Sequence, residues 1–161
     1  REQEVCQLHW SWLVKRDDAI WYFEIPAGFV KNRMRRVVVL NDIAKSVIQK
    51  RTGEHPKYVF VYEDHPINGM NGTAFRKARK RATIKLPSLM NVGVHNLKHT
   101  YGARLRVAGV PEEDRNFLTG HKGRESMTTY YSAPELNKML EYSNRVCQQN
   151  DNLVLLNRRA S

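Results

Sequence analysis

The segment HNLKHTYGARLRVAGV, residues 95–110, restricts the choice of fold more than any other part of the chain. It reads as a helix that ends at Gly109, and Pro111 opens the next helix, because proline is favoured in a first helical turn. Residues three apart lie on the same face of a helix, so His95 and Lys98 are expected to project together near its N-terminus. A helix N-terminus with a histidine and a cation suits a phosphate, because the helix dipole and the side-chain charge act together.

The same segment raises the alternative of a metal site. His95 and His99 have the four-residue spacing of the zinc-protease motif, but that motif has a glutamate directly after its first histidine, where this chain has Asn96. No third ligand stands at a recognisable spacing. The sequence therefore predicts no metal site, and His99 and Thr100 are expected to be buried hydrogen-bonding residues.

Composition describes one folded domain with a strong positive charge. The chain has 161 residues, of which 41% are hydrophobic, and its formal net charge is +11. A chain of this length can bury a core, and the hydrophobic content is that of a folded protein. Cys6 and Cys147 do not form a CxxC motif and are expected to be buried free thiols.

The positive charge is concentrated in two clusters, one in AFRKARKRATIK (residues 74–85), which contains no acidic residue, and one in VKNRMRRVVVL (residues 30–40). Neutralising phosphates releases counterions, so acid-free basic clusters favour a nucleic acid. An anionic membrane is the weaker alternative, because no amphipathic helix carries bulky apolar residues opposite these charges. A solvated basic face is the third interpretation. The DNA-binding candidates are Arg33, Arg35, Arg36, Arg76, Lys77, Arg79, Lys80 and Arg81.

The order of β-rich and helical segments predicts an α+β fold: a mostly helical domain with a small N-terminal three-stranded antiparallel sheet. A hairpin turn is expected at Asp17–Asp18, between the first two strands. The strands of this sheet are expected in residues 10–16, 19–25 and 35–40, and residues 57–62 are expected to form a short strand or a buried extended segment. Helices are expected in residues 41–55, 71–84 and 95–109, from Pro111 and from Pro134.

The helix expected at residues 41–55 has clear signals at both ends. Asn41 is a candidate N-cap, and Gly53 is a candidate stop. The apolar residues Ile43, Val47 and Ile48 recur at helical spacing and are expected to form the stripe that faces the core.

Four short sequence motifs occur in a recognisable order along the chain. REQEVCQLHW carries Arg1 and Glu4, FVKNRMRRVVVLND carries Lys31, HNLKHTYGARLRVAGV follows, and LTGHK carries His121 about ten residues before a pair of tyrosines. This order resembles the catalytic domain of the tyrosine recombinases, the phage integrase family. The resemblance implies a catalytic domain over residues 1–147 and a C-terminal tail over residues 148–161.

The resemblance also implies a mechanism for cutting DNA. Arg1, Lys98 and His121 would neutralise and hydrogen-bond the scissile phosphate, His95 would act as general base, and Lys31 would protonate the leaving 5′ oxygen. A tyrosine would form a 3′-phosphotyrosyl intermediate, which conserves the bond energy, so no metal, ATP or other cofactor is implied. Lys98 departs from the family pattern, which has arginine there. A lysine supplies charge but not a planar two-pronged donor.

Two adjacent tyrosines compete for the role of nucleophile. In the family, the tyrosine follows the histidine of the L-G-H motif, here His121, at a usual interval that selects Tyr130. The flanking pattern T-T-x-Y-S-A instead selects Tyr131. A one-residue insertion near Glu125 is easier than a change in the register of the segment that carries the nucleophile. Tyr131 is therefore the preferred nucleophile, and Tyr130 is the alternative.

The function implied by the resemblance is site-specific DNA recombination or integration. A non-cutting DNA-binding module on the same fold, which Lys98 permits, and a type IB topoisomerase-like enzyme that relaxes DNA are the alternatives. The implied partner is double-stranded DNA, bound by a homotetramer on paired recombination sites, and the isolated domain is expected to be a monomer. No membrane partner is expected, and the implied location is the bacterial cytoplasm, on the nucleoid, for a protein of bacterial or phage origin. An N-terminal DNA-clamping domain is expected to accompany this domain in the whole protein.

Overall fold

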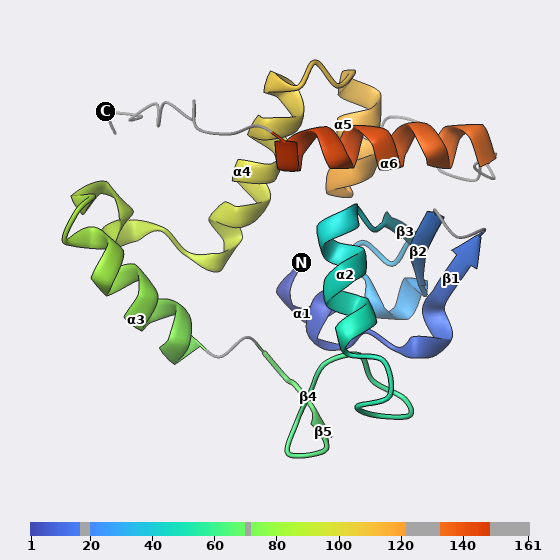
Figure 1. The fold of residues 1–161 in the computed structure, drawn as a ribbon, viewed down its shortest axis with the longest axis horizontal. Helices are drawn as coiled ribbons and strands as arrows, with labels where there is room; N and C mark the ends of the chain where they lie inside the picture. Colours follow the sequence, from blue (N-terminus) through green and yellow to red (C-terminus); the bar gives the residue numbers. More distant parts are fainter. Residues whose placement is uncertain (17–19, 70–71, 122–132, 149–161) are drawn as a thin grey trace.

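The computed structural model describes residues 1–16, 20–69, 72–121 and 133–148. It confirms the predicted α+β class, and Figure 1 shows the three-stranded sheet near helices α2 and α6, with helix α3 lying apart from them. The α-helices (α), 3-10 helices (η) and strands (β) in chain order are α1 (Glu2–Cys6), η1 (Trp10–Trp12), β1 (Leu13–Arg16), β2 (Ile20–Ile25), η2 (Ala27–Phe29), β3 (Arg36–Val39), α2 (Asp42–Lys50), β4 (Val61–Tyr62), β5 (His65–Pro66), α3 (Gly72–Thr83), η3 (Pro87–Asn91), α4 (Val94–Val107), α5 (Glu112–Thr119) and α6 (Ala133–Gln148).

The sheet has the order β1-β2-β3, and both neighbouring pairs are antiparallel, as predicted. Phe23 of β2 lies opposite Leu13 of β1 and opposite Val38 of β3. Central strand β2 is thus paired on both sides, which leaves β1 and β3 as the edges. The expected hairpin turn at Asp17–Asp18 lies outside the described residues.

The two faces of the sheet contact two separate hydrophobic cores. Ile20 and Val39 pack in one cluster with Leu105 of α4 and with residues of α5 and α6. Phe23 packs in the other cluster with Ile48 of α2. Successive residues of a strand point to opposite faces, so the same strands serve both cores. Strand β3 is therefore held between α2 on one face and the C-terminal helices on the other.

Helix α2 begins as its sequence signals predict. The Asn41 side-chain Oδ1 accepts a hydrogen bond from the Ala44 backbone N–H at 2.8 Å, which is the N-cap interaction. The helix ends at Lys50, and Gly53 lies just beyond it with a φ of 87°, a conformation that glycine adopts without strain. The Asn41 side-chain Nδ2 also donates to the Ser143 carbonyl oxygen at 3.4 Å, which ties the start of α2 to α6.

The predicted apolar stripe of α2 is wrong for two of its three residues. Ile48 is buried, but Ile43 and Val47 are 59% and 44% exposed. Val47 lines an open cavity between α2 and the C-terminal helices, so no side chain covers it there. Local spacing correctly identified one apolar face, but the tertiary contacts cover only its Ile48 edge.

The C-terminal helices follow the predicted boundaries closely. Helix α4 ends at Val107, and Gly109 takes a φ of 72°, which terminates the helix before Pro111 introduces α5. Helix α6 contributes the buried Leu136 to the core. The Cys147 side chain is exposed, so the expectation of a buried thiol is wrong for it, although Cys6 is buried. Adjacent helical residues differ by about 100° in direction, so the neighbouring Val146 faces the core and Cys147 does not.

Helix α3 confirms the cationic helix predicted from the sequence, and with η3 it forms an arm. No residue of α3 is buried. The Arg79 side-chain Nη1 donates to the Val92 carbonyl oxygen at 3.0 Å, which fastens α3 to the segment after η3. Ile84 and Met90, in this arm, are 83% and 64% exposed. The arm therefore presents most of its basic helix to solvent.

Candidate active site

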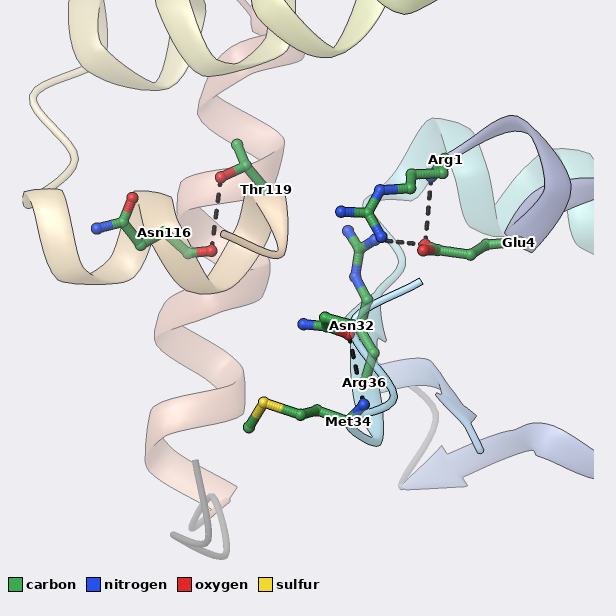
Figure 2. A network of polar contacts seen from close by, with 7 residues as sticks. All are labelled: Arg1, Glu4, Asn32, Met34, Arg36, Asn116 and Thr119. Carbon is green, nitrogen blue, oxygen red and sulfur yellow. Dashed lines mark hydrogen bonds and ion pairs between the residues drawn. The ribbon is translucent and has the colours of Figure 1, made fainter. Parts of the chain in front are cut away.

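The buried Glu4 and the partly buried Arg36 form an ion pair where α1 meets the sheet. Arg36 is the first residue of β3, and its Nη1 lies 2.5 Å from Glu4 Oε2. The two side chains are only 15% and 5% exposed. Glu4 Oε2 also accepts a hydrogen bond from the backbone nitrogen of Arg1 at 3.2 Å. In Figure 2 the Arg1 and Arg36 side chains extend toward the same place beside Glu4. Separating a buried pair leaves a charge without compensation, so this contact holds α1 and β3 together.

Lys98 reaches the same region from α4. The pKa of Lys98 is lowered, first by its burial and then by the positive charges of Arg36 and Arg1, while Glu4 opposes the change. All four groups line the same cavity, so they lie close enough to one another for these electrostatic effects. The structure thus brings Arg1 and Lys98, two of the predicted phosphate-binding residues, to one place, and it adds Arg36.

His95 lies on the exposed side of α4. Its ring centre is 4.9 Å from that of His99, and the two ring planes make an angle of 81°. His99 and Thr100 are both exposed, so the expectation that they are buried is wrong. The reason is helical geometry: Tyr101 and Leu105, four residues apart, occupy the face of α4 that packs on the core.

His121 follows directly after α5 and is held through one ring nitrogen. Its Nδ1 lies 3.0 Å from Thr119 Oγ1, and that hydroxyl lies 2.7 Å from the Arg115 carbonyl oxygen, to which it donates. The contact occupies Nδ1, so Nε2 is the ring nitrogen through which His121 could reach a substrate. The pKa of His121 is lowered, first by desolvation and then by the positive charges of Lys98, His99 and the two arginines, Arg1 and Arg36.

Two neighbouring cavities meet at Arg1 and Glu4, which line both. The first, of about 530 Å³, lies between α1 and the connection from β2 to β3, and Lys31 and Arg33 line it. The second, of about 450 Å³, separates α1 and α2 from the C-terminal helices, and Lys98 lines it. Lys31, which is exposed in its turn, therefore opens onto a cavity that also contains Arg1.

The DNA-binding candidates divide into two kinds by their surroundings. Arg33 is exposed with a φ of 52°, and Arg35 is exposed and paired with Glu24. Arg36, in contrast, is partly buried and paired with Glu4. On α3, Arg79 is partly buried, and its four cationic neighbours on the helix are exposed: Arg76, Lys77, Lys80 and Arg81.

Tyr130 and Tyr131 both lie outside the described residues, so their position relative to this site remains a prediction. Within the described ranges, no three side chains of histidine, cysteine, aspartate or glutamate gather in a way that could hold a metal ion. In the same part of the chain, every helix is too short or too polar to cross a bilayer.

The fold and the site define a mostly helical α+β domain whose N-terminal sheet and C-terminal helices converge on a centre rich in cations. The chain belongs to the phage integrase family, whose sequence profile matches residues 1–137. The integrase of Salmonella phage P22 is 28% identical over 155 residues, which cover 91% of this chain and 39% of that relative. The chain therefore spans well under half the length of that curated relative. No solved structure matches the chain significantly.

Two residues of the site were not identified as such from the sequence. Arg36 was assigned to the basic DNA-binding cluster, and no local signal separates it from Arg33 and Arg35. Thr119 had no assigned role, although its place two residues before His121 puts its hydroxyl within reach of that ring. Both roles depend on contacts between segments or on the exact course of the chain at the end of α5.

Proposed function

We propose that this chain is the catalytic domain of a site-specific DNA recombinase, which cuts and rejoins DNA through a 3′-phosphotyrosyl intermediate. The observation that carries the proposal is that Arg1 and Lys98, from α1 and α4, line one cavity and that their positive charges act on His121 at the end of α5. Cations held close together repel one another, and a phosphodiester bound among them would neutralise part of that charge. Membership of the phage integrase family supports the same function.

The chemistry follows from the charge of the phosphodiester. A phosphorus atom resists attack until the negative charge on its non-bridging oxygens is neutralised. Arg1 and Lys98 would supply that neutralisation, and His121 would donate a further hydrogen bond when protonated. Binding an anion would raise the pKa of His121 from its lowered value, because the phosphate charge offsets the surrounding cations.

Proton transfer is proposed for two further residues. His95 would accept the proton of the attacking tyrosine, for which Tyr131 is the proposed nucleophile. Lys31 would protonate the 5′ oxygen that leaves, and its position on a cavity shared with Arg1 supports this role. The phosphate is then held in an ester with tyrosine until a free 5′-hydroxyl attacks it, so the proposed reaction transfers a strand without hydrolysis.

The experiment that tests this function is covalent trapping. The full-length protein is incubated with a nicked duplex whose cleavage releases a short strand, and the product is digested and examined by mass spectrometry. A tyrosyl peptide that carries a 3′-linked nucleotide is the expected result. Duplex binding without any adduct would support the alternative, a DNA-binding module, which the lysine at position 98 permits. An adduct together with relaxation of supercoiled DNA but no recombination would indicate a topoisomerase-like enzyme.

The proposed partner is double-stranded DNA, bound by a homotetramer on paired sites in the whole protein. The proposed domain extends over residues 1–147. Sedimentation of the protein with and without paired-site DNA would measure the assembly, and a species that stays monomeric on DNA would contradict the tetramer. The proposed location is the bacterial cytoplasm, on the nucleoid, where such DNA is available.

The exposed cations of α3 are expected to contact the DNA backbone. Replacing Lys77 and Arg81 together by glutamine should lower the affinity for specific and random duplexes alike. The slope of log K against log salt concentration should become shallower by ~1 to 2 units, at about 0.9 per lost phosphate contact. A variant with Lys15 and Lys50 replaced by glutamine has the same net charge and serves as control. Equal slopes for the two variants would mean that α3 is a solvated face.

The hydroxyl of Thr119 is expected to orient His121. Thr119→Val preserves the shape of the side chain but removes the contact with Nδ1, and a neutral hydrogen bond contributes roughly 1 kcal/mol. The single-turnover rate of adduct formation should therefore fall by about 2- to 10-fold. Thr119→Ser retains the hydroxyl and should stay close to the unaltered protein. If both variants lose the same activity, the role of Thr119 lies in packing rather than in the contact.

A further inference from the structure

Arg36 differs from the other arginines of its cluster in what surrounds it. The side chain of Arg35 is 59% exposed, whereas that of Arg36 is 15% exposed and paired with Glu4. Its Nη1 is occupied by Glu4, and its Nε is buried. To reach a DNA backbone, Arg36 would have to break a pair whose carboxylate is almost completely buried, which is unfavourable.

The guanidinium of Arg36 also lies directly against the chain at Gly120. A Cβ atom built on Gly120 would lie 2.5 Å from Cζ, 2.7 Å from Nε and 2.9 Å from Nη2 of Arg36. Gly120 has a φ of 63°, in the left-handed region that favours glycine. Glycine is therefore favoured at this position for two reasons, the backbone conformation at the end of α5 and the space that Arg36 occupies.

Three segments that are distant in sequence thus meet on one planar side chain. Arg36 belongs to β3, Glu4 to α1, and Gly120 to the end of α5, immediately before His121. Figure 2 shows Arg36 between Glu4 on one side and Thr119, at the end of α5, on the other. A shift of this guanidinium would allow both α1 and the segment before His121 to move.

We propose that Arg36 is a positioning residue, which holds Glu4 and α1 and fixes His121 through its contact with Gly120, and that it is not a contact to the DNA backbone. The proposal rests on the proposed function, since it assigns Arg36 to the preparation of the phosphate-binding site. A lysine cannot replace it, because a compact ammonium group cannot both pair with Glu4 and fill the space beside Gly120 that the guanidinium occupies.

The first test compares binding and cleavage in the full-length protein. Arg36→Lys keeps the charge and Arg36→Gln removes it, and both are expected to slow adduct formation at saturating DNA by roughly 10- to 100-fold, the effect of displacing reacting groups by a fraction of a bond length. The duplex Kd and its salt dependence should stay nearly unchanged. Arg33→Gln, which removes an exposed cation of the same cluster, should instead weaken duplex binding. A loss of affinity for Arg36→Lys or Arg36→Gln with a salt slope shallower by ~1 unit would overturn the proposal and make Arg36 a phosphate contact.

The second test needs no catalytic activity. Gly120→Ala is expected to lower the Tm more when Arg36 is present than when Arg36 has been replaced by alanine, because the added methyl group meets the guanidinium only in the first case. Contacting residues show such coupling, whereas independent residues have additive effects. Additive changes in Tm would overturn the contact with Gly120 and, with it, the proposed role.

The third test reports directly on His121. Its pKa is lowered by desolvation, by Lys98 and His99 of α4, and by the two arginines of α1 and β3. Arg36→Gln removes one of these charges, so the titration of the His121 ring, followed by NMR, should move to higher pH. Arg33→Gln should leave it in place, and equal titrations in both variants would contradict the proximity of Arg36 to His121.

One further variant guards against a failure to fold. If Arg36→Gln unfolds because the buried Glu4 loses its guanidinium partner, Glu4→Gln combined with Arg36→Gln replaces the ion pair by a neutral hydrogen-bonded pair. The His121 titration and the binding measurement are then made on that variant. An absence of adduct in the unaltered protein would contradict the proposed recombinase, while the Tm coupling and the His121 titration would still decide the role of Arg36.

Discussion

Tyr131→Phe in the full-length protein is expected to abolish the covalent DNA adduct. The hydroxyl is the only atom group that this substitution removes, and without it the proposed nucleophile cannot form a phosphate ester. The assignment rests on the residues that flank Tyr131, which match the family pattern at that register. The adduct would be measured by denaturing electrophoresis of the trapped product and located by mass spectrometry.

Tyr130→Phe is the matched control, because it removes an identical hydroxyl from the adjacent residue. It is expected to leave adduct formation largely intact. An adduct that survives in Tyr131→Phe and disappears in Tyr130→Phe would reverse the assignment. Duplex binding should be unchanged in both variants, which separates a chemical defect from a folding defect.

Lys98→Ala is expected to reduce the cleavage rate by roughly 10²-fold or more, in the range observed for removing one donor that stabilises a transition state. Lys98 lies on the cavity that also contains Arg1, and its positive charge would act most strongly where charge develops on the phosphate. Duplex affinity should change little, because many other cations contribute to ground-state binding. Single-turnover cleavage and equilibrium binding, measured on the same substrate, give the two quantities. Equal losses in both would make Lys98 an ordinary phosphate anchor.

Lys98→Arg gives a pH-dependent version of the same prediction. The pKa of Lys98 is lowered by burial, Arg36 and Arg1, so this lysine loses its charge at a lower pH than a free lysine does. Arginine stays charged throughout this range. The ratio of the Lys98→Arg rate to the unaltered rate should therefore rise as the pH increases, and titrations common to both proteins cancel in this ratio. A ratio that is constant with pH would mean that the charge on Lys98 does not limit cleavage.

The sequence by itself determined the class of fold and most of its elements, because the signals for these are local. Gly109 and Pro111 separate α4 from α5, and Asn41 caps α2, each through interactions within a few residues. The three strands and their antiparallel order also follow from local patterns. The resemblance to the family motifs predicts Arg1 and Lys98 as site residues, and the structure brings both to the same cation-rich centre.

Only the tertiary structure decided which basic residues are partly buried in contacts with distant segments and which apolar residues are exposed. Arg33, Arg35 and Arg36 are nearly equivalent in sequence, yet one of them is enclosed by Glu4 and Gly120, which lie far from it along the chain. Val47 belongs to an apolar stripe by spacing but lines an open cavity. Burial depends on which segments pack together, and that is a property of long-range contacts, whereas helix ends and strand periodicity depend on neighbours in the chain. The sequence shows that Arg36 is positively charged, but its contact with Gly120 forms only when β3, α1 and α5 pack together.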